Sequence, residues 1–97
     1  MKALFIVYNQ AYNQEIVELL GGMGQRGYTV WEGVGGRGSE SGEPHLGNHA
    51  WPTQNHALFS VMEDSLAAEV MKKLREVDGA NPALGLRAYV LPVEEAL

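Results

Sequence analysis

The six apolar residues at positions 3–8 are the feature that most constrains how this chain can fold. The run reads ALFIVY, follows a single lysine and ends at Asn9 and Gln10. A short apolar run without polar alternation is typical of a strand that is buried on both of its faces. We therefore expect residues 3–8 to form a strand of a sheet whose two faces both need covering.

The rest of the pattern predicts two helices and three further strands. Apolar residues at three- and four-residue spacings mark the helices, and β-branched and aromatic residues mark the strands. We expect Asn13 to cap the first helix, and Gly21, Gly22 and Gly24 to fray its end. The expected elements are a helix over 12–23, strands over 28–32 and 57–62, a helix from Asp64 or Ser65 to Asp78, and a strand over 86–91.

This order of elements, βαββαβ, predicts a single α+β domain over residues 1–97 with a ferredoxin-like fold. Its four-stranded antiparallel sheet has two helices on one face and a long loop between the second and third strands. Alternation along a strand predicts that Leu4, Ile6 and Tyr8 point to one face and that Phe5 and Val7 point to the other. Because both faces are apolar, we expect the face without helices to pack against other copies of the chain.

Composition excludes several classes of partner. The formal net charge is −5 and the seven Lys and Arg residues are dispersed, which argues against binding to nucleic acid. The chain has no cysteine, so disulfides and thiolate metal ligands are absent. Its first apolar run is too short for a signal peptide or a membrane span, so we expect a cytoplasmic protein that is not embedded in a membrane.

The loop over 33–55 concentrates the residues that could bind a ligand. A segment of this length without regular structure is typically functional or disordered. Neutral imidazole is the commonest protein ligand for zinc and copper, and carboxylates can complete such sites. The candidate metal ligands are His45, His49 and His56, with Glu40 and Glu43 as additional ligands. The alternative is a polar surface loop whose histidines bond to the backbone.

A second candidate in the same loop is a glycine-rich anion site. Glycines allow backbone N–H groups to converge on an anion, and the guanidinium of Arg37 adds further donors. The candidate residues are Gly36, Arg37, Gly38, Glu40 and Gly42. The spacing does not match a Walker sequence, so a flexible hinge is the competing interpretation.

No set of residues has the spacing of a nucleophile with its base or of paired catalytic carboxylates, so we do not expect an enzyme. A metal-dependent hydrolase that uses the histidines is the weak alternative. Tyr28, Trp31 and Tyr89 lie on expected strands and are assigned to packing in the core or between subunits.

The segment 27–32 leads into the glycine-rich segment 36–42, and together with the order of elements it resembles the P-II signalling superfamily. CutA-type trimers are similar in architecture. The resemblance implies a homotrimer whose projecting T-loop, here within 33–55, touches a partner protein. The group of divergent P-II-like proteins also includes metal-associated members, and the resemblance therefore raises the metal hypothesis.

Two departures from the family pattern argue against nucleotide binding of the family kind. Glu40 stands where the family has Gln, and an ionised carboxylate can only accept hydrogen bonds. The segment 81–85 contains no cation, although the family has lysine there. The sequence therefore predicts a trimeric, non-enzymatic P-II-like regulator that binds zinc or copper, with a nucleotide or small anion between subunits at 36–42 as the alternative.

Overall fold

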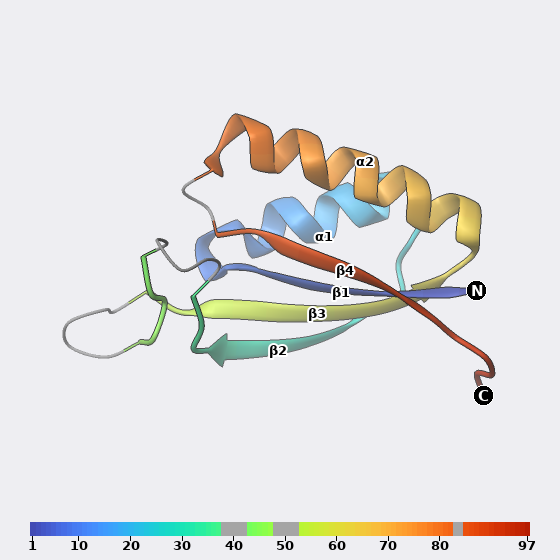
Figure 1. Cartoon of the computed structure of the whole chain (residues 1–97), viewed down its shortest axis with the longest axis horizontal. Helices are drawn as coiled ribbons and strands as arrows, with labels where there is room; N and C mark the ends of the chain where they lie inside the picture. The colour runs from blue at the N-terminus through green and yellow to red at the C-terminus, as the bar shows by residue number, and fades with distance from the viewer. Residues whose placement is uncertain (38–42, 48–52, 83–84) are drawn as a thin grey trace.

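The computed structural model describes residues 1–37, 43–47, 53–82 and 85–97. Its elements follow the order predicted from the sequence and confirm the α+β, ferredoxin-like fold (Figure 1). Among the described residues, no helix is long and apolar enough to cross a membrane. The elements are β1 (Lys2–Asn9), the 3₁₀ helix η1 (Gln10–Tyr12), α1 (Asn13–Gly22), β2 (Thr29–Val34), β3 (Asn55–Met62), α2 (Asp64–Ala80) and β4 (Arg87–Pro92).

The sheet places β1 between two neighbours. Its strand order is β2-β3-β1-β4, and every neighbouring pair is antiparallel. In the register, Phe5 of β1 lies opposite Phe59 of β3 and Tyr89 of β4. Because the side-chain period of a strand is two, this register assigns every side chain of the sheet to one of two faces.

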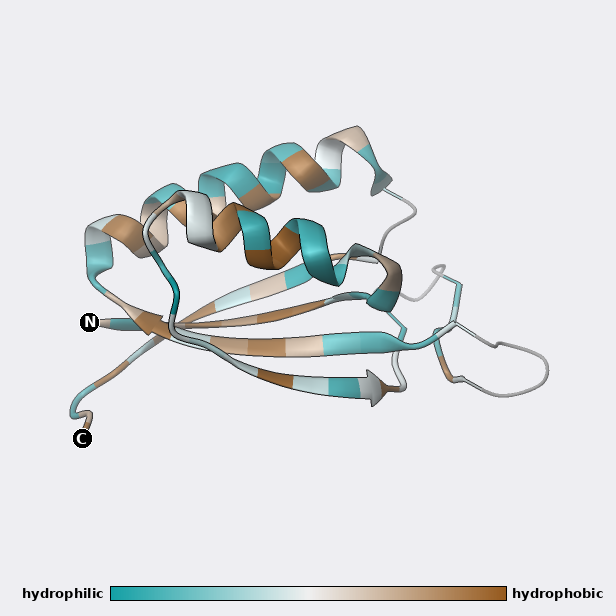
Figure 2. Ribbon diagram, turned by 180° about the vertical axis from the view of Figure 1, so that it is seen from behind, coloured by the Kyte–Doolittle hydropathy of each residue, from teal (hydrophilic) through white to brown (hydrophobic). Residues whose placement is uncertain are grey.

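One face of the sheet packs against both helices, as Figure 2 shows from behind. Leu4, Ile6 and Tyr8 of β1 are completely buried there, as expected from the alternation. The helices contribute apolar side chains at helical spacing. The core on this face contains Leu4, Ile6, Tyr8, Ile16, Leu20, Leu58, Met62, Ala67, Val70, Leu74 and Leu86.

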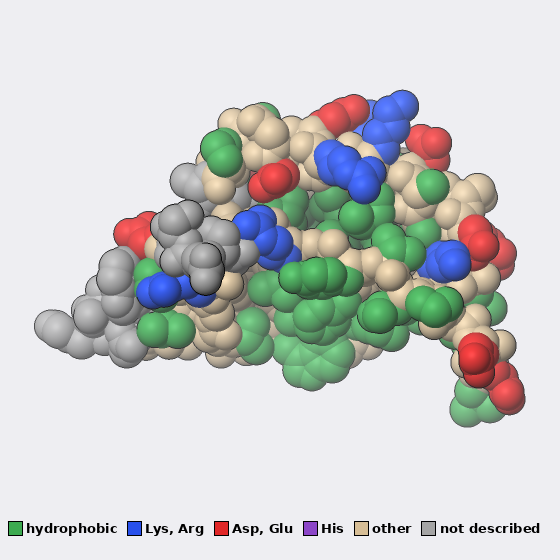
Figure 3. All heavy atoms as spheres, viewed as in Figure 1, with side chains coloured by type: hydrophobic (Ala, Val, Ile, Leu, Met, Phe, Trp, Pro, Cys, Tyr) green, Lys and Arg blue, Asp and Glu red, His purple; other side chains and the backbone are tan. Residues whose placement is uncertain are grey.

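The other face, which we call the open face, is covered by none of the helices in the described part of the chain. Phe5 and Val7 are only half-buried there, and Trp31 and Tyr89 remain 49% and 54% exposed. The rings of Phe5 and Trp31 contact one another with centroids 6.4 Å apart. Apolar side chains gather below the helices in Figure 3, so the sheet presents an aromatic surface to its surroundings.

The first helix differs from the expectation at its start. Asn9, not Asn13, provides the side-chain cap, because its Oδ1 accepts from the amide of Ala11 and starts η1. Asn13 instead accepts a hydrogen bond from the Tyr8 hydroxyl. The helix ends at Gly22 with Met23 as its C-cap, and Gly24 follows in the turn with a φ of 87°, which is accessible to glycine at little cost.

The second helix begins without the expected cap. Neither Asp64 nor Ser65 occupies the N-cap, which is Glu63, and no side chain bonds the first amides. The carboxylate of Asp64 lies 2.8 Å from the N-terminal amine of Met1. This hydrogen bond and the positive charge hold the pKa of Asp64 below its usual value. Asp78 does not end the helix, which extends to Ala80.

Candidate functional site

Two backbone bridges link the middle of the long loop, at His45 and Leu46, to its start and to its end. Gly36 and His45 form an antiparallel bridge in which each amide donates to the other residue's carbonyl, at 2.8 and 2.6 Å. A second bridge pairs Leu46 with Gln54, immediately before β3. These bridges hold the residues at the start of the loop beside those that lead into β3.

His45 is buried at the base of the loop and is only 6% exposed. Its Nδ1 lies 2.6 Å from Oδ1 of Asn55, the first residue of β3, which is also buried. The ring also packs against Gly85, where an added Cβ would lie 3.2 Å from Cε1 of His45. His45, a candidate metal ligand from the sequence, therefore has a side-chain partner within the fold.

A hollow of about 250 Å³ opens beside this base on the open face of the sheet. β1 and β4 supply its apolar wall, the start of the loop supplies its rim, and Asn55 and Gly85 complete it. The lining residues are Phe5, Val7, Gly36, Arg37, Asn55, Gly85, Arg87 and Tyr89. The hollow therefore combines polar groups at the loop end with aromatic surface along the strands.

The described lining of this hollow carries only positive charge. Of the described residues that line it, Arg37 and Arg87 are positively charged and none is negatively charged. Guanidinium groups present planar sets of N–H donors that match carboxylate and phosphate oxygens. Beside an apolar wall, water screens the charges of the two arginines less strongly. The hollow therefore favours a negatively charged ligand such as an oxyanion.

Arg87 was missed as a site residue, although its place on the open face was predictable from alternation in the last strand. The segment 81–85, where the family pattern has lysine, contains no cation. The cation instead lies at position 87, the first residue of β4, opposite Val7 in the register. Its Nη1 also donates to the carbonyl of Leu86 at 2.7 Å.

The expected anion set is only partly described. Gly36 and Arg37 line the hollow, as the alternative hypothesis required. Gly38, Glu40 and Gly42 lie outside the described residues.

The expected metal set is not brought together by the described residues. His56 belongs to β3 and not to the loop, and it lies opposite Tyr8 on the helix-facing side of the sheet. The adjacent Asn55 lies on the other side, where it lines the hollow and contacts His45. Glu43 is exposed, and His49 and Glu40 lie outside the described residues. Within the described ranges, no group of three or more His, Asp or Glu side chains could hold a metal ion.

His56 has a packing role against the core tyrosine. Its ring stacks on Tyr8 with centroids 6.1 Å apart, and its buried Nδ1 has no hydrogen-bond partner among the described residues. Burial, with a smaller contribution from Tyr28, raises the pKa of Tyr8 to about 12. The Tyr8 hydroxyl is held at 2.6 Å by Oδ1 of Asn13.

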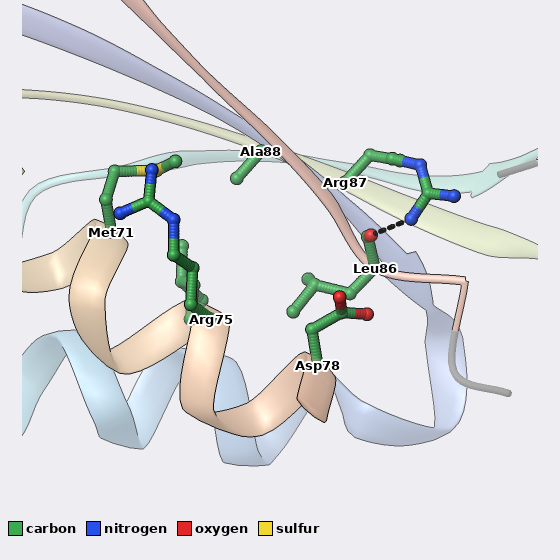
Figure 4. A pocket seen from close by; sticks show the side chains of 7 residues that line it. Met71, Arg75, Asp78, Leu86, Arg87 and Ala88 are labelled. Carbon is green, nitrogen blue, oxygen red and sulfur yellow. Dashed lines mark hydrogen bonds between the residues drawn. The ribbon is translucent and has the colours of Figure 1, made fainter. Parts of the chain in front are cut away.

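A second hollow, of about 280 Å³, lies on the other side of β4, between that strand and α2 (Figure 4). Its floor is apolar, with Met71, Leu74 and Leu86, and Arg75 and Asp78 stand on the helix side. Arg87 also borders this hollow, so its described lining carries two positive charges and one negative charge. The carboxylate of Asp78 makes it less favourable for an anion than the first hollow, whose described lining has no negative charge. None of the candidate metal or anion ligands from the sequence is among its described lining residues.

The four-stranded antiparallel sheet with two helices on one face defines a small α+β domain with a ferredoxin-like fold. The profile of one family, described as Nitrogen regulatory protein P-II, matches residues 1–97. The chain therefore belongs to the P-II family. A search of curated proteins found no match.

Solved structures of PII-like proteins share the fold. One PII-like signaling protein from Thermus thermophilus is 25% identical, with a TM-score of 0.65 over 92% of this chain and 81% of that chain. CPII from Thiomonas intermedia, a nitrogen regulatory PII-like protein solved with ADP, AMP and bicarbonate, is 17% identical. Its TM-score is 0.72, over 99% of this chain and 94% of that chain. CPII has also been solved with ADP, AMP and acetate, at 18% identity and a TM-score of 0.71, over 99% of this chain and 88% of that chain.

The raised pKa of Tyr8 predicts a dependence of stability on alkaline pH. The folded protein keeps the phenol proton up to about pH 12, whereas an unfolded tyrosine loses it near pH 10. The folded state thus binds more protons in this interval, and the free energy of unfolding falls as pH rises through it. Tyr8→Phe should cost about 1 kcal/mol at neutral pH, through loss of the bond to Asn13.

Urea denaturation at about pH 8 and about pH 11 measures both effects. The free energy of unfolding should fall less steeply with pH in Tyr8→Phe than in the unmodified protein, so that the two proteins converge at high pH. The other tyrosines are present in both proteins, so their contributions cancel in the comparison. A stability difference that stays constant between the two pH values would show that Tyr8 is not shielded as described.

Proposed function

We propose that this protein is a P-II-like regulator whose effector is an oxyanion or a nucleotide, bound through the hollow at Gly36, Arg37, Asn55 and Arg87. The observation on which this depends is the pair of guanidinium groups in a partly apolar hollow at the loop base. Ligand binding there favours one arrangement of the loop over 33–55 and so changes the surface shown to a partner protein. No chemical step is required of the protein.

The size of the hollow limits what one chain can hold alone. Ligand sites for drug-sized molecules have volumes of about 300–1,000 Å³, and this hollow has about 250 Å³. A bicarbonate, carboxylate or single phosphate group fits within it. A nucleotide would place one part here and extend toward a neighbouring copy, which agrees with a site between subunits.

The family and its solved members support this choice over a metal. CPII, which shares the fold, has been solved with ADP and bicarbonate and with ADP, AMP and acetate. All of these ligands are anions. The histidines proposed as metal ligands are instead divided between the two sides of the sheet, so far as they are described. We therefore place the anion hypothesis ahead of zinc or copper binding.

Isothermal titration with ADP, AMP and sodium bicarbonate tests the proposal. At least one of the three should bind the unmodified protein. Arg37→Ala and Arg87→Ala should each weaken that binding about tenfold or more, because a hydrogen bond to a charged group contributes about 1.5–3 kcal/mol. Arg75→Ala is the matched control, since it removes the same charge from the hollow on the other side of β4.

A parallel titration with zinc and copper decides between the two hypotheses. The double variant His49→Ala/His56→Ala leaves His45 and the hollow intact and should bind the anionic ligands as the unmodified protein does. If none of the three anionic ligands binds, and zinc binds in a way that this double variant abolishes, the anion proposal is wrong.

The open face provides the surface for assembly into a trimer. Trp31, Tyr89 and Leu91 are each close to half exposed on one face of the sheet, and Phe5 lies beneath them. Apolar surface of this kind is buried when copies associate, at about 25 cal/mol per Å². The hollow lies on the same face, so association of copies would also complete the ligand site.

Light scattering at several concentrations tests this assembly. We expect a mass three times the 10.6 kDa of one chain. Trp31→Glu should shift the protein toward the monomer, because it places a charge in the contact. Ala68→Glu adds the same charge on the exposed side of α2 and should leave the trimer intact. A stable monomer of the unmodified protein at all concentrations would overturn the assembly.

A further inference from the structure

Asn55 has an orientation that matters for any anion in the hollow. An amide side chain has an acceptor end and a donor end, and only the donor end attracts an oxyanion. The Oδ1 of Asn55 lies 2.6 Å from Nδ1 of His45. Because an amide oxygen can only accept, Nδ1 of His45 carries the proton and donates it. The oxygen of Asn55 is therefore turned to His45.

The nitrogen end of the same amide is turned to the base of the loop. An added Cβ on Gly36 would lie 3.2 Å from Nδ2 of Asn55, which places this nitrogen beside the first residue of the hollow's rim. Asn55 and Gly36 both line the hollow together with Arg37 and Arg87. The nitrogen end of the Asn55 amide is therefore the end that lies beside the Gly36 rim of the hollow.

His45 and Asn55 pack close to the backbone of two glycines, where a larger residue would crowd them. An added Cβ on Gly85 would lie 3.2 Å from Cε1 of His45, and the one on Gly36 would lie equally close to Asn55. Gly85 also has a φ of 71°, which side-chain-bearing residues rarely adopt. Both side chains are almost fully buried. The donor end of Asn55 is consequently held in place before any ligand arrives.

We propose that Asn55 determines the specificity of the hollow for an oxyanion, by donating its amide N–H to the bound anion, and that His45 is the positioning residue that fixes this donor. The inference rests on the proposed function, since it names the part that one further residue plays at the same site. The ligand chemistry is an oxyanion, such as a carboxylate, bicarbonate or phosphate group. Preorganised donors of this kind bind without a cost of reorientation.

Two substitutions of Asn55 distinguish the contribution of its N–H donor to anion affinity from the contribution of its side-chain size. Asn55→Asp keeps an oxygen to accept from His45 but presents a carboxylate oxygen where the amide N–H was, so that an anion is repelled. Asn55→Leu keeps a similar volume and removes the donor without adding charge. In titrations with bicarbonate and ADP, we expect a loss of about 100-fold or more for Asn55→Asp and about tenfold for Asn55→Leu.

The matched control is Asn13→Asp. Asn13 also accepts a short hydrogen bond with its Oδ1, from the Tyr8 hydroxyl at 2.6 Å, but it lies at the start of α1, on the helix side of the sheet. The substitution adds the same charge and retains the acceptor, and it should change anion affinity less than twofold. A loss in Asn13→Asp equal to that in Asn55→Asp would mean that net charge alone explains the effect, and would overturn the proposal.

The role of His45 is read from nitrogen NMR of the unmodified protein, which avoids variants that fail to fold. We expect the ring to be protonated at Nδ1, and the side-chain N–H₂ signal of Asn55 to shift on titration with bicarbonate. In His45→Ala, the Asn55 signal should shift less at saturating bicarbonate, because the amide is no longer fixed. Protonation at Nε2 alone, or an Asn55 signal that stays unchanged at saturation, would overturn the proposal.

Failure of this inference is distinguishable from failure of the proposed function. If the unmodified protein binds none of the anionic ligands, both are wrong. If it binds them and loses affinity in Arg37→Ala and Arg87→Ala but not in Asn55→Asp or Asn55→Leu, the hollow is the site and Asn55 is not its donor.

Discussion

The alternation of side chains along β1, fixed by its pairing with β3 and β4, is the constraint on which the rest of the structure depends. It directs Leu4, Ile6 and Tyr8 into the core beneath the helices. It directs Phe5 and Val7 into the hollow on the open face. A shift of the register by one residue would exchange the two sets and would remove both the core and the apolar wall of the candidate site.

The loop base depends on a second constraint, which is the close approach of four segments that are distant in sequence. The Gly36 and His45 bridge closes the loop, Asn55 begins β3, and Gly85 leads into β4. Glycine at positions 36 and 85 leaves room for the Asn55 amide and the His45 ring. Packing at this point connects the hollow to the loop backbone, so a ligand bound in the hollow would lie close to the loop.

Much of the fold was predictable because its signals are local. The apolar run at 3–8, the helical spacing of Val70 and Leu74, and the alternation that sets Arg87 and Tyr89 against Leu86 all determine structure through neighbouring residues. The helix ends were less predictable, because caps depend on single hydrogen bonds. Asn13 was expected to cap α1 but bonds to Tyr8 in the folded chain.

The candidate site was less predictable, because its residues meet only through the sheet register and the loop bridges. His45 and His56 are close in sequence, which suggested a shared ligand, but β3 begins between them and sends Asn55 and His56 to opposite sides. Arg87 and Asn55 belong to no motif. A signal for Arg87 existed in the alternation of the last strand, but nothing local indicated that Arg37 would lie across the same hollow.

The central claim is that the hollow between Arg37, Asn55 and Arg87 holds the anionic part of the effector. A crystal structure of the protein grown with ADP and bicarbonate tests it most directly. The account predicts electron density for an oxyanion in contact with both guanidinium groups and the Asn55 amide nitrogen. Density for a bound anion elsewhere on the protein, with this hollow containing only water, would contradict it.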